Sequence, residues 1–248
     1  MDIIEITQGN IENEHLCCAI SDKKSTQVKR EWLMERMKDG YRFCKMDGQG
    51  KAFIEFVPAE HAWSPISANG YLFIDCFWVS GSFAKKGYGT QLLKVCIEEA
   101  KRMGKKGLVA LSSDKKRPFV SDPKFYKKRG FLVADTAQPY FELLYLPFEE
   151  GAPPCFLSTA KEGKNDAQGV VIYYTDHCPW NAKYMPLLQK TAEERGAQVT
   201  FVHISTQDDA QACPCPFTTY AVYYNGAFVT NEMMSDKKFV KFLEEKGL

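Results

Sequence analysis

No apolar run in these 248 residues approaches the ~18–20 residues that a membrane-spanning helix needs. Residues 1–5 also lack the basic start and the apolar core of a secretory signal. We therefore expect a cytoplasmic protein with no membrane partner. The 45% hydrophobic and 25% charged residues are ordinary for a globular chain, and the length suffices for two modest domains.

The sequence also lacks a Cys-x-x-Cys pair, although it contains nine cysteines. Their odd number and irregular spacing favour reduced thiols over a disulfide framework. Cys44, Cys76 and Cys96 fall within predicted strands or a helix, where cysteine behaves as a small buried hydrophobe. We predict no metal site.

Net charge is scarce as well, at +1, but it is unevenly distributed. Residues 85–129 hold 14 Lys and Arg against 4 Asp and Glu. Such a basic segment is compatible with nucleic-acid binding. We instead expect a small polyanionic ligand and no nucleic acid, because the basic residues surround a glycine-containing turn.

That turn is the most informative feature present. A mostly apolar segment, 71–80, predicts a strand, and apolar residues at helical spacing predict a helix over 90–103. Between them, Gly87 and Gly89 allow a ligand to approach the backbone, and two lysines add positive charge. The free amide groups and the dipole at the start of a helix favour anions, and a diphosphate suits this site.

A short second helix is predicted over 122–131. Asp122 is placed to cap its start, Pro123 suits its first position, and Gly130 suits the residue after its end. A helix of barely two turns depends on tertiary contacts for its stability. Elements of this kind often shape a binding site.

Together these motifs resemble the GCN5-related N-acetyltransferase (GNAT) family over residues 1–148. The family's acetyl-CoA turn, Arg/Gln-x-x-Gly-x-Gly/Ala, corresponds to residues 84–89, and its Phe-Tyr-x-Lys-x-Gly-Phe motif corresponds to residues 125–131. Ala84 departs from the usual Arg or Gln, which leaves more of the diphosphate binding to backbone amides and lysines. The resemblance implies acetyl-CoA as cosubstrate and, as its contacts, Trp78, Val79, Ala84, Lys85, Lys86, Gly87, Tyr88, Gly89, Thr90 and Phe125.

The resemblance also implies catalytic roles. Tyr126 matches the family's general acid, which protonates the departing thiolate. Backbone amides near Trp78 and Val79, where we expect the strand to part from its neighbour, would polarise the thioester carbonyl. Glu60 is the first candidate for the general base, with Asp75 and His61 as alternatives.

A cluster at residues 14–18 is a candidate for substrate contact or for an accessible thiol. It contains Glu14, His15, Cys17 and Cys18. A buried pair of cysteines beside solvated polar residues is the alternative. Trp32, Trp63 and Phe119 are compatible with an apolar or aromatic acceptor, or simply with core packing.

The expected fold class is a mixed α/β GNAT fold followed by a smaller domain. A Pro- and Gly-containing stretch and a polar run predict a linker over 149–167. Residues 168–248 then predict the order strand, helix, strand, β-hairpin and helix, with Cys178 where the first strand meets its helix. This order resembles a thioredoxin-like domain, and the two-part chain resembles acetyltransferases with a YoaP-type C-terminal domain.

The sequence thus predicts an N-acetyltransferase that transfers acetyl to a primary amine of a small molecule or peptide, by direct attack in a ternary complex. An alternative is a thiol-dependent binding or redox protein that uses Cys178, with an N-terminal domain that senses acyl-CoA without catalysis. Cys213 or Cys215 would then have to act as the resolving thiol. The acceptor and the oligomeric state stay open.

Overall fold

The structure, a computed structural model, describes residues 1–16 and 22–248. The strands of the N-terminal part are β1 Ile3–Ile6, β2 Arg42–Met46, β3 Ala52–Pro58, β5 Tyr71–Val79, β6 Gly107–Ser113, β7 Leu132–Ala137 and β8 Phe141–Pro147. They form one sheet in the order β1-β2-β3-β5-β6-β8-β7. Neighbouring strands are antiparallel except β5 and β6, which are parallel. The predicted mixed sheet is confirmed, and β2 and β3 form an antiparallel hairpin within it.

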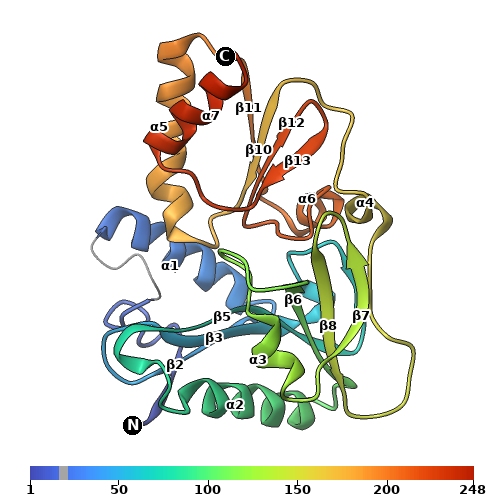
Figure 1. The fold of residues 1–248 in the computed structure, drawn as a ribbon. Coiled ribbons are helices and arrows are strands. Elements are labelled where there is room, and N and C mark those ends of the chain that lie inside the picture. Colours follow the sequence, from blue (N-terminus) through green and yellow to red (C-terminus); the bar gives the residue numbers. More distant parts are fainter. Residues whose placement is uncertain (17–21) are drawn as a thin grey trace.

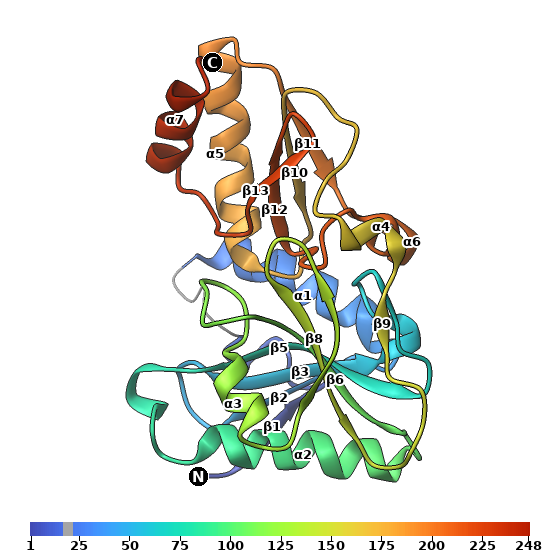
Figure 2. The same cartoon turned by 45° about the vertical axis from the view of Figure 1, so that its right-hand side comes forward.

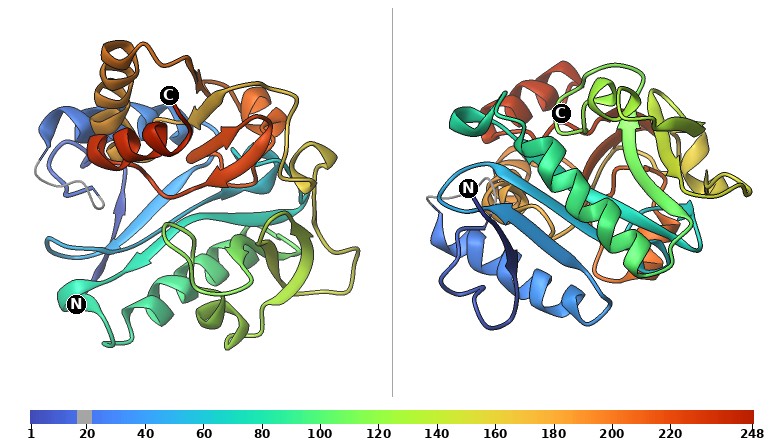
Figure 3. Two further views of the ribbon diagram at one scale, coloured as in Figure 1. Left: turned by 45° about the horizontal axis from the view of Figure 1, so that its top comes forward. Right: turned by 90° about the horizontal axis from the view of Figure 1, so that it is seen from below.

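Three helices accompany this sheet: α1 Lys23–Met37, α2 Tyr88–Arg102 and α3 Pro123–Lys127. α2 lies across the lower face of the sheet, as the view from below shows (Figure 3). α1 lies on the opposite face, between the sheet and the C-terminal part (Figures 1 and 2). It begins at Lys23, because the Asp22 side chain accepts a hydrogen bond from the Ser25 amide and so caps the helix.

The C-terminal part has its own sheet, whose strands are β10 Val170–Tyr174, β11 Val199–His203, β12 Tyr220–Tyr224 and β13 Ala227–Thr230. The strand order is β11-β10-β12-β13, with β10 and β11 parallel and the remaining pairs antiparallel. Its helices are α5 Pro179–Arg195, α6 Gln207–Ala212 and α7 Asp236–Glu245. The hairpin at Asn225-Gly226 is confirmed, since both residues take the positive φ that a tight turn requires. α6 was not predicted from the sequence.

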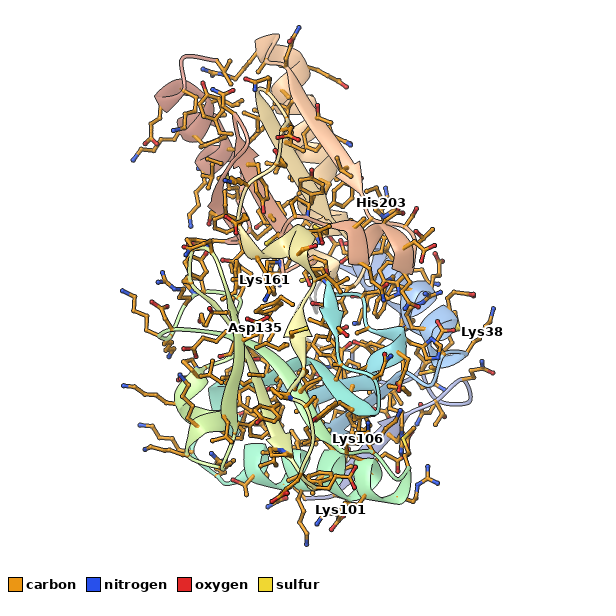
Figure 4. The ribbon with its side chains drawn as sticks, turned by 90° about the vertical axis from the view of Figure 1, so that its right-hand side faces the viewer. Lys38, Lys101, Lys106, Asp135, Lys161 and His203 are labelled. Carbon is orange, nitrogen blue, oxygen red and sulfur yellow. The ribbon has the colours of Figure 1, made fainter. Side chains whose placement is uncertain are left out.

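The segment between the two parts is folded. β9 (Cys155–Phe156) pairs with β4 (Ile66–Ser67), and α4 (Ser158–Lys161) follows at once. Lys161 of α4 forms an ion pair of 2.8 Å with Asp135 of β7, and the two side chains lie together in Figure 4. Residues predicted as a linker therefore pack against the N-terminal part.

A single hydrophobic cluster extends through both parts of the molecule. It includes Trp63 and Phe73 from the N-terminal part and Cys215 and Tyr223 from the C-terminal part. A second cluster fills the space between the sheet and α2. Within the described ranges, no helix combines the length and apolarity needed to cross a bilayer.

Candidate functional site: an anion turn and an interdomain cavity

The glycine turn forms an open helix start. The chain leaves a short 3-10 helix (η2, Gly81–Phe83), and Lys85 and Gly87 both take positive φ, 60° and 80°. Gly87 precedes the first residue of α2, and its carbonyl accepts hydrogen bonds from the amides of Thr90 and Gln91 at 3.0 and 3.2 Å. The amides just before these have no backbone partner among the described residues, so they are available to an anion.

The surroundings of the turn fit a diphosphate. Lys85, Lys86 and Gly87 are exposed. A side chain at Gly89 would place its Cβ 3.1 Å from the Phe125 ring, so glycine permits this close packing. Arg129, which follows α3, donates to the Thr90 hydroxyl at 2.7 Å and thereby brings a third cation to the start of α2.

Strands β5 and β6 part in the middle of the sheet. Their parallel pairing covers Tyr71 to Ile74 and ends there, although β5 continues to Val79. The pairing of β5 with β3 skips Asp75, which is a β-bulge, so that Asp75 and Cys76 both line the same cavity. The sequence-based expectation that the strands part at Trp78 and Val79 was wrong by several residues. A bulge shifts the register without leaving any mark in the apolar pattern.

Tyr126 is buried behind this gap. Tyr126 is 1% exposed, and its hydroxyl has the Ser121 side chain beside it but no well-formed hydrogen bond among the described residues. Burial raises the pKa of Tyr126 far above the ordinary value of a phenol, while hydrogen bonding from the Ser121 side chain opposes the shift. A buried hydroxyl is favourable only when it has a good hydrogen-bond acceptor. The sulfur of a bound thioester would supply one.

A cavity of about 560 Å³ lies on the side of the sheet that faces the C-terminal part. Its lining includes Phe73, Asp75 and Cys76 of β5, and it also includes His177, Cys178 and Trp180 from the C-terminal part. Ser121 and Cys76 line it as well, and both lie close enough to Tyr126 to influence the pKa of its hydroxyl. The cavity wall and the Tyr126 hydroxyl are therefore neighbours.

The floor of the cavity carries a cluster of buried polar side chains. Lys29 and Glu55 form an ion pair of 2.6 Å in which both side chains are at most 2% exposed. The same carboxylate oxygen of Glu55 lies 2.7 Å from the Tyr41 hydroxyl and 3.1 Å from His177 Nε2. Burial acts to raise the pKa of Glu55, but Lys29 and His177 outweigh it and lower that pKa to about 2. Glu55 is thus an anion neutralised by its neighbours.

Asp75 has fewer partners. The Tyr41 hydroxyl lies 2.9 Å from Asp75 Oδ2, and the same hydroxyl contacts Glu55. A phenol has one proton to donate, so Asp75 shares the Tyr41 hydroxyl, its one close donor among the described residues, with Glu55. His177 Nε2 is 3.7 Å away, and no Lys or Arg forms an ion pair with Asp75 among the described residues. Asp75 is therefore the carboxylate of the cluster without a Lys or Arg counter-ion among the described residues.

The other site residues predicted from the sequence are divided between the cavity and the rest of the surface. The Glu60 carboxylate accepts from the Gly70 amide at 2.7 Å and pairs with Lys105 at 3.0 Å, and it does not line the cavity. His61 is exposed, whereas Trp63 and Phe119 line the cavity. Glu14 pairs with Lys45 at 2.9 Å.

The remaining candidates concern thiols and the cluster at residues 14–18. His15 has no hydrogen-bond partner among the described residues, and Cys17 and Cys18 lie outside the described ranges. Cys178 precedes α5 and faces the cavity.

The cysteines of the C-terminal part do not favour redox chemistry. Cys213 and Cys215 are both at most 2% exposed, and burial raises the pKa of Cys213 to about 12. Because the thiolate is the reactive form, they are poorly suited to resolve a disulfide. No cysteine in the described part of the chain forms a disulfide, and that part contains no cluster of metal-binding side chains.

Sequence reasoning missed the cluster itself. Lys29, Tyr41, Glu55 and His177 come from four separate elements or loops, and no motif joins them. The one available signal was Glu55 in an otherwise apolar strand, since a buried carboxylate requires a partner.

Comparison with known proteins places these features in context. A model described as "Acetyltransferase (GNAT) family" matches residues 10–131, and one described as "YoaP-like" matches residues 198–241. The chain is 39% identical to "Uncharacterized N-acetyltransferase YoaP" of Bacillus subtilis, over 98% of each chain. It is 29% identical to "Uncharacterized N-acetyltransferase MJ1207" of Methanocaldococcus jannaschii, over 46% of this chain and 48% of the other.

Solved structures give a looser likeness. A GNAT family acetyltransferase from Brucella melitensis in complex with acetyl-CoA is 16% identical, with a TM-score of 0.40 over 61% of this chain and 90% of that one. A PaiA N-acetyltransferase from Thermoplasma acidophilum in complex with coenzyme A is 15% identical, with a TM-score of 0.41 over 60% of this chain and all of the other.

Proposed function

Because this chain belongs to the GNAT family of N-acetyltransferases, we propose that it transfers acetyl from acetyl-CoA to a primary amine of a small molecule or peptide by direct attack in a ternary complex. One observation supports this most strongly. An open, basic helix start packs through Gly89 on Phe125 of α3, and the next residue of α3, Tyr126, has its ring 6.1 Å from that of Phe77, in the part of β5 that no longer pairs with β6.

The proposed cosubstrate contacts follow the chain from β5 to α3. The diphosphate binds at the amides of residues 86–90, assisted by Lys85 and Lys86, and the pantetheine arm enters the gap between β5 and β6. Phe125 packs on Gly89 and on Phe77, with ring centroids 4.9 Å apart in the second contact. This aromatic pair connects the turn with the cavity wall.

Tyr126 is the proposed donor to the leaving sulfur. Its raised pKa keeps the hydroxyl protonated, so it can donate a hydrogen bond to the sulfur as negative charge develops there. In direct attack, the new N–C bond forms, the C–S bond breaks, and the thiolate leaves as a thiol after protonation.

We also propose a division into a GNAT domain at 1–148, a connecting segment at 149–167 and a thioredoxin-like domain at 168–248. Support for the last comes from its strand order, in which a parallel pair is extended by an antiparallel hairpin, with helices after β10, β11 and β13. Cys178 starts its first long helix. The absence of a second cysteine three residues later argues against dithiol chemistry there.

The cosubstrate site is tested with two glycine variants. Gly87 and Gly104 flank the two ends of α2, both have positive φ (80° and 65°), and a side chain at either would meet no atom within 4 Å. G87E and G104E therefore introduce the same strain and charge, but only G87E places the carboxylate at the proposed diphosphate site. Titration calorimetry should show that G87E weakens acetyl-CoA binding by about 100-fold or more, while G104E binds like the wild type. Equal affinity of all three proteins would refute the site.

A further inference from the structure

We propose that the cavity between the two domains is the acceptor site, and that it takes a compact, singly charged primary amine with an aromatic or aliphatic body. The ammonium group binds at Asp75, and the C-terminal domain supplies the opposite wall and thus helps to select the acceptor. This inference rests on the proposed acetyl transfer.

The position of the cavity supports an acceptor role. It lies on the face of the sheet opposite α2, and it meets the gap between β5 and β6 at Asp75, Cys76 and Phe77. An amine at Asp75 would approach the gap from one face, while the acetyl group would come from the side of the glycine turn. Direct attack requires this opposed arrangement of the two substrates.

The charges limit the acceptor to one cation. Of the three lining carboxylates, Glu55 pairs with Lys29, and Glu232 accepts from Lys238 at 2.5 Å. Only Asp75 lacks a Lys or Arg partner among the described residues of the lining. A substrate with several ammonium groups would leave most of them in an apolar wall, where they are costly.

Much of the remaining wall is apolar and aromatic, although Lys51 and several Ser and Thr residues also line it. Trp78 and Phe119 are 41% and 42% exposed and line the cavity, and Trp180, Tyr184 and Phe217 line it from the C-terminal domain. Phe119 has a φ of 62°, a conformation that costs energy for a bulky residue and is held only by its surroundings. The volume of about 560 Å³ lies within the ~300–1,000 Å³ that is usual for small-molecule pockets.

The C-terminal wall is firmly attached. The Thr218 hydroxyl donates to the Trp63 carbonyl at 2.5 Å, and the Ser64 hydroxyl donates to the Pro216 carbonyl at 3.1 Å. The His177 ring lies against Trp32 of α1 in a tilted arrangement, with ring centroids 4.8 Å apart and an interplanar angle of 40°. The second domain is therefore a fixed part of the cavity.

The proposed reaction balances in atoms, protons and electrons. The ammonium loses two protons as the amide forms. One passes to Asp75 and then to solvent, and the departing sulfur, stabilised by a hydrogen bond from Tyr126, takes up the other and leaves as the thiol. The N–C bond forms, the C–S bond breaks, and no oxidant, reductant or metal is needed.

The test uses the full chain with 2-phenylethylamine, tryptamine and hexylamine as probes. Release of the coenzyme A thiol and the mass of the product report acetyl transfer, and calorimetry reports binding of each amine and of acetyl-CoA. We expect at least one amine to bind and to be acetylated, and we expect its hydroxyl analogue, such as 2-phenylethanol, to bind at least tenfold more weakly. If none of the three amines binds or reacts, or if only a ten-residue peptide reacts, the proposed class of acceptor is wrong.

Variants then locate the site. D75N should weaken binding of the amine by about 10–100-fold, since it removes the unpaired charge, whereas D166N makes the same change on the exposed surface and should have no effect. W180A and F217A should each weaken amine binding by about tenfold, and L187A on the exposed surface of α5 should not.

Acetyl-CoA affinity separates this inference from the proposed function. It should stay at the wild-type value in all five variants, which also shows that they are folded. Unchanged amine binding in D75N, W180A and F217A would overturn the interdomain site and leave acetyl transfer standing. A wild-type protein that does not bind acetyl-CoA would overturn the proposed function itself.

Discussion

The two faces of the central sheet contrast in how they are built. On the α2 face, the proposed cosubstrate site comes mainly from a continuous stretch of chain, residues 84–90, and it is open and basic. On the other face, the proposed acceptor site combines residues from β3, β5 and the C-terminal domain, and it is partly enclosed, rich in aromatic residues and acidic at its floor. A ligand shared by a whole family can be bound by a local motif, whereas the acceptor is selected by surfaces brought together only on folding.

The two faces also differ in how their charged side chains are stabilised. Lys85 and Lys86 are exposed and rely on solvent, while Lys29 and Glu55 are buried and rely on each other. Exposed charges contribute little individually, but a buried charge without its partner is strongly destabilising. Substitutions on the two faces should therefore differ in which property they change, stability or cosubstrate binding, as well as in the size of the change.

The largest effect is expected on the acceptor face, where E55Q would leave Lys29 buried without a counter-ion. We expect a loss of about 3–5 kcal/mol in the free energy of unfolding, measured with a chemical denaturant. E98Q is the matched control, because Glu98 pairs with Lys94 on the exposed side of α2 and should cost at most about 1 kcal/mol. Equal stability of the two variants would show that the buried cluster is not a structural element.

Tyr126 lies between the two faces, and the variant Y126F tests whether its hydroxyl takes part in the reaction. We expect kcat to fall by about 100-fold with little change in KM, because the hydroxyl is needed only as charge develops on the sulfur. The hydroxyl forms no well-formed hydrogen bond in the described part of the chain, so its removal should change the melting temperature little. Unaltered kcat would remove Tyr126 from the mechanism.

Low pH should destabilise the buried cluster around Glu55 on the acceptor face. The folded-state pKa of Glu55 is about 2, below its usual value of 4.5, so the ionised form stabilises the fold above pH ~4.5. As the pH falls from about 4.5 to 2, Glu55 takes up a proton and this contribution is lost. Denaturation measured at several pH values should show a steeper loss of stability over this range in the wild type than in E55Q. Parallel curves would contradict the assignment.

The smallest effect is expected on the cosubstrate face. K86A should raise the KM for acetyl-CoA by about two- to fivefold at low salt, because one exposed charge contributes ~0.2–1 kcal/mol. The difference from the wild type should shrink at 1 M salt, where screening is strong. K190A, which removes an exposed lysine from α5, serves as the control. A salt-independent effect would mean that Lys86 does not act through its charge.

Much of the fold was predictable because its signals are local. The strand predicted over 71–80 and the helix predicted over 90–103 correspond to β5 and α2 to within two residues at each end, since apolar patterning fixes them. The short helix α6 escaped prediction, although Thr206 and Asp209 cap it reciprocally, because six residues are too few for a periodic pattern. The segment 149–167 resembled a linker in composition, yet it pairs through β9 and Lys161 with distant residues.

The sequence by itself determined the glycine turn, the short helix with Tyr126 and the two-part order of elements, because each depends on neighbours a few residues apart. Only the tertiary structure decided that Asp75 occupies a bulge, that Glu60 lies outside the cavity, and that His177 meets Glu55 across 122 residues of chain. The physical reason is that a buried charge is stable only beside its partner, and the partner can come from any element that the packing of the two domains brings within about 3 Å.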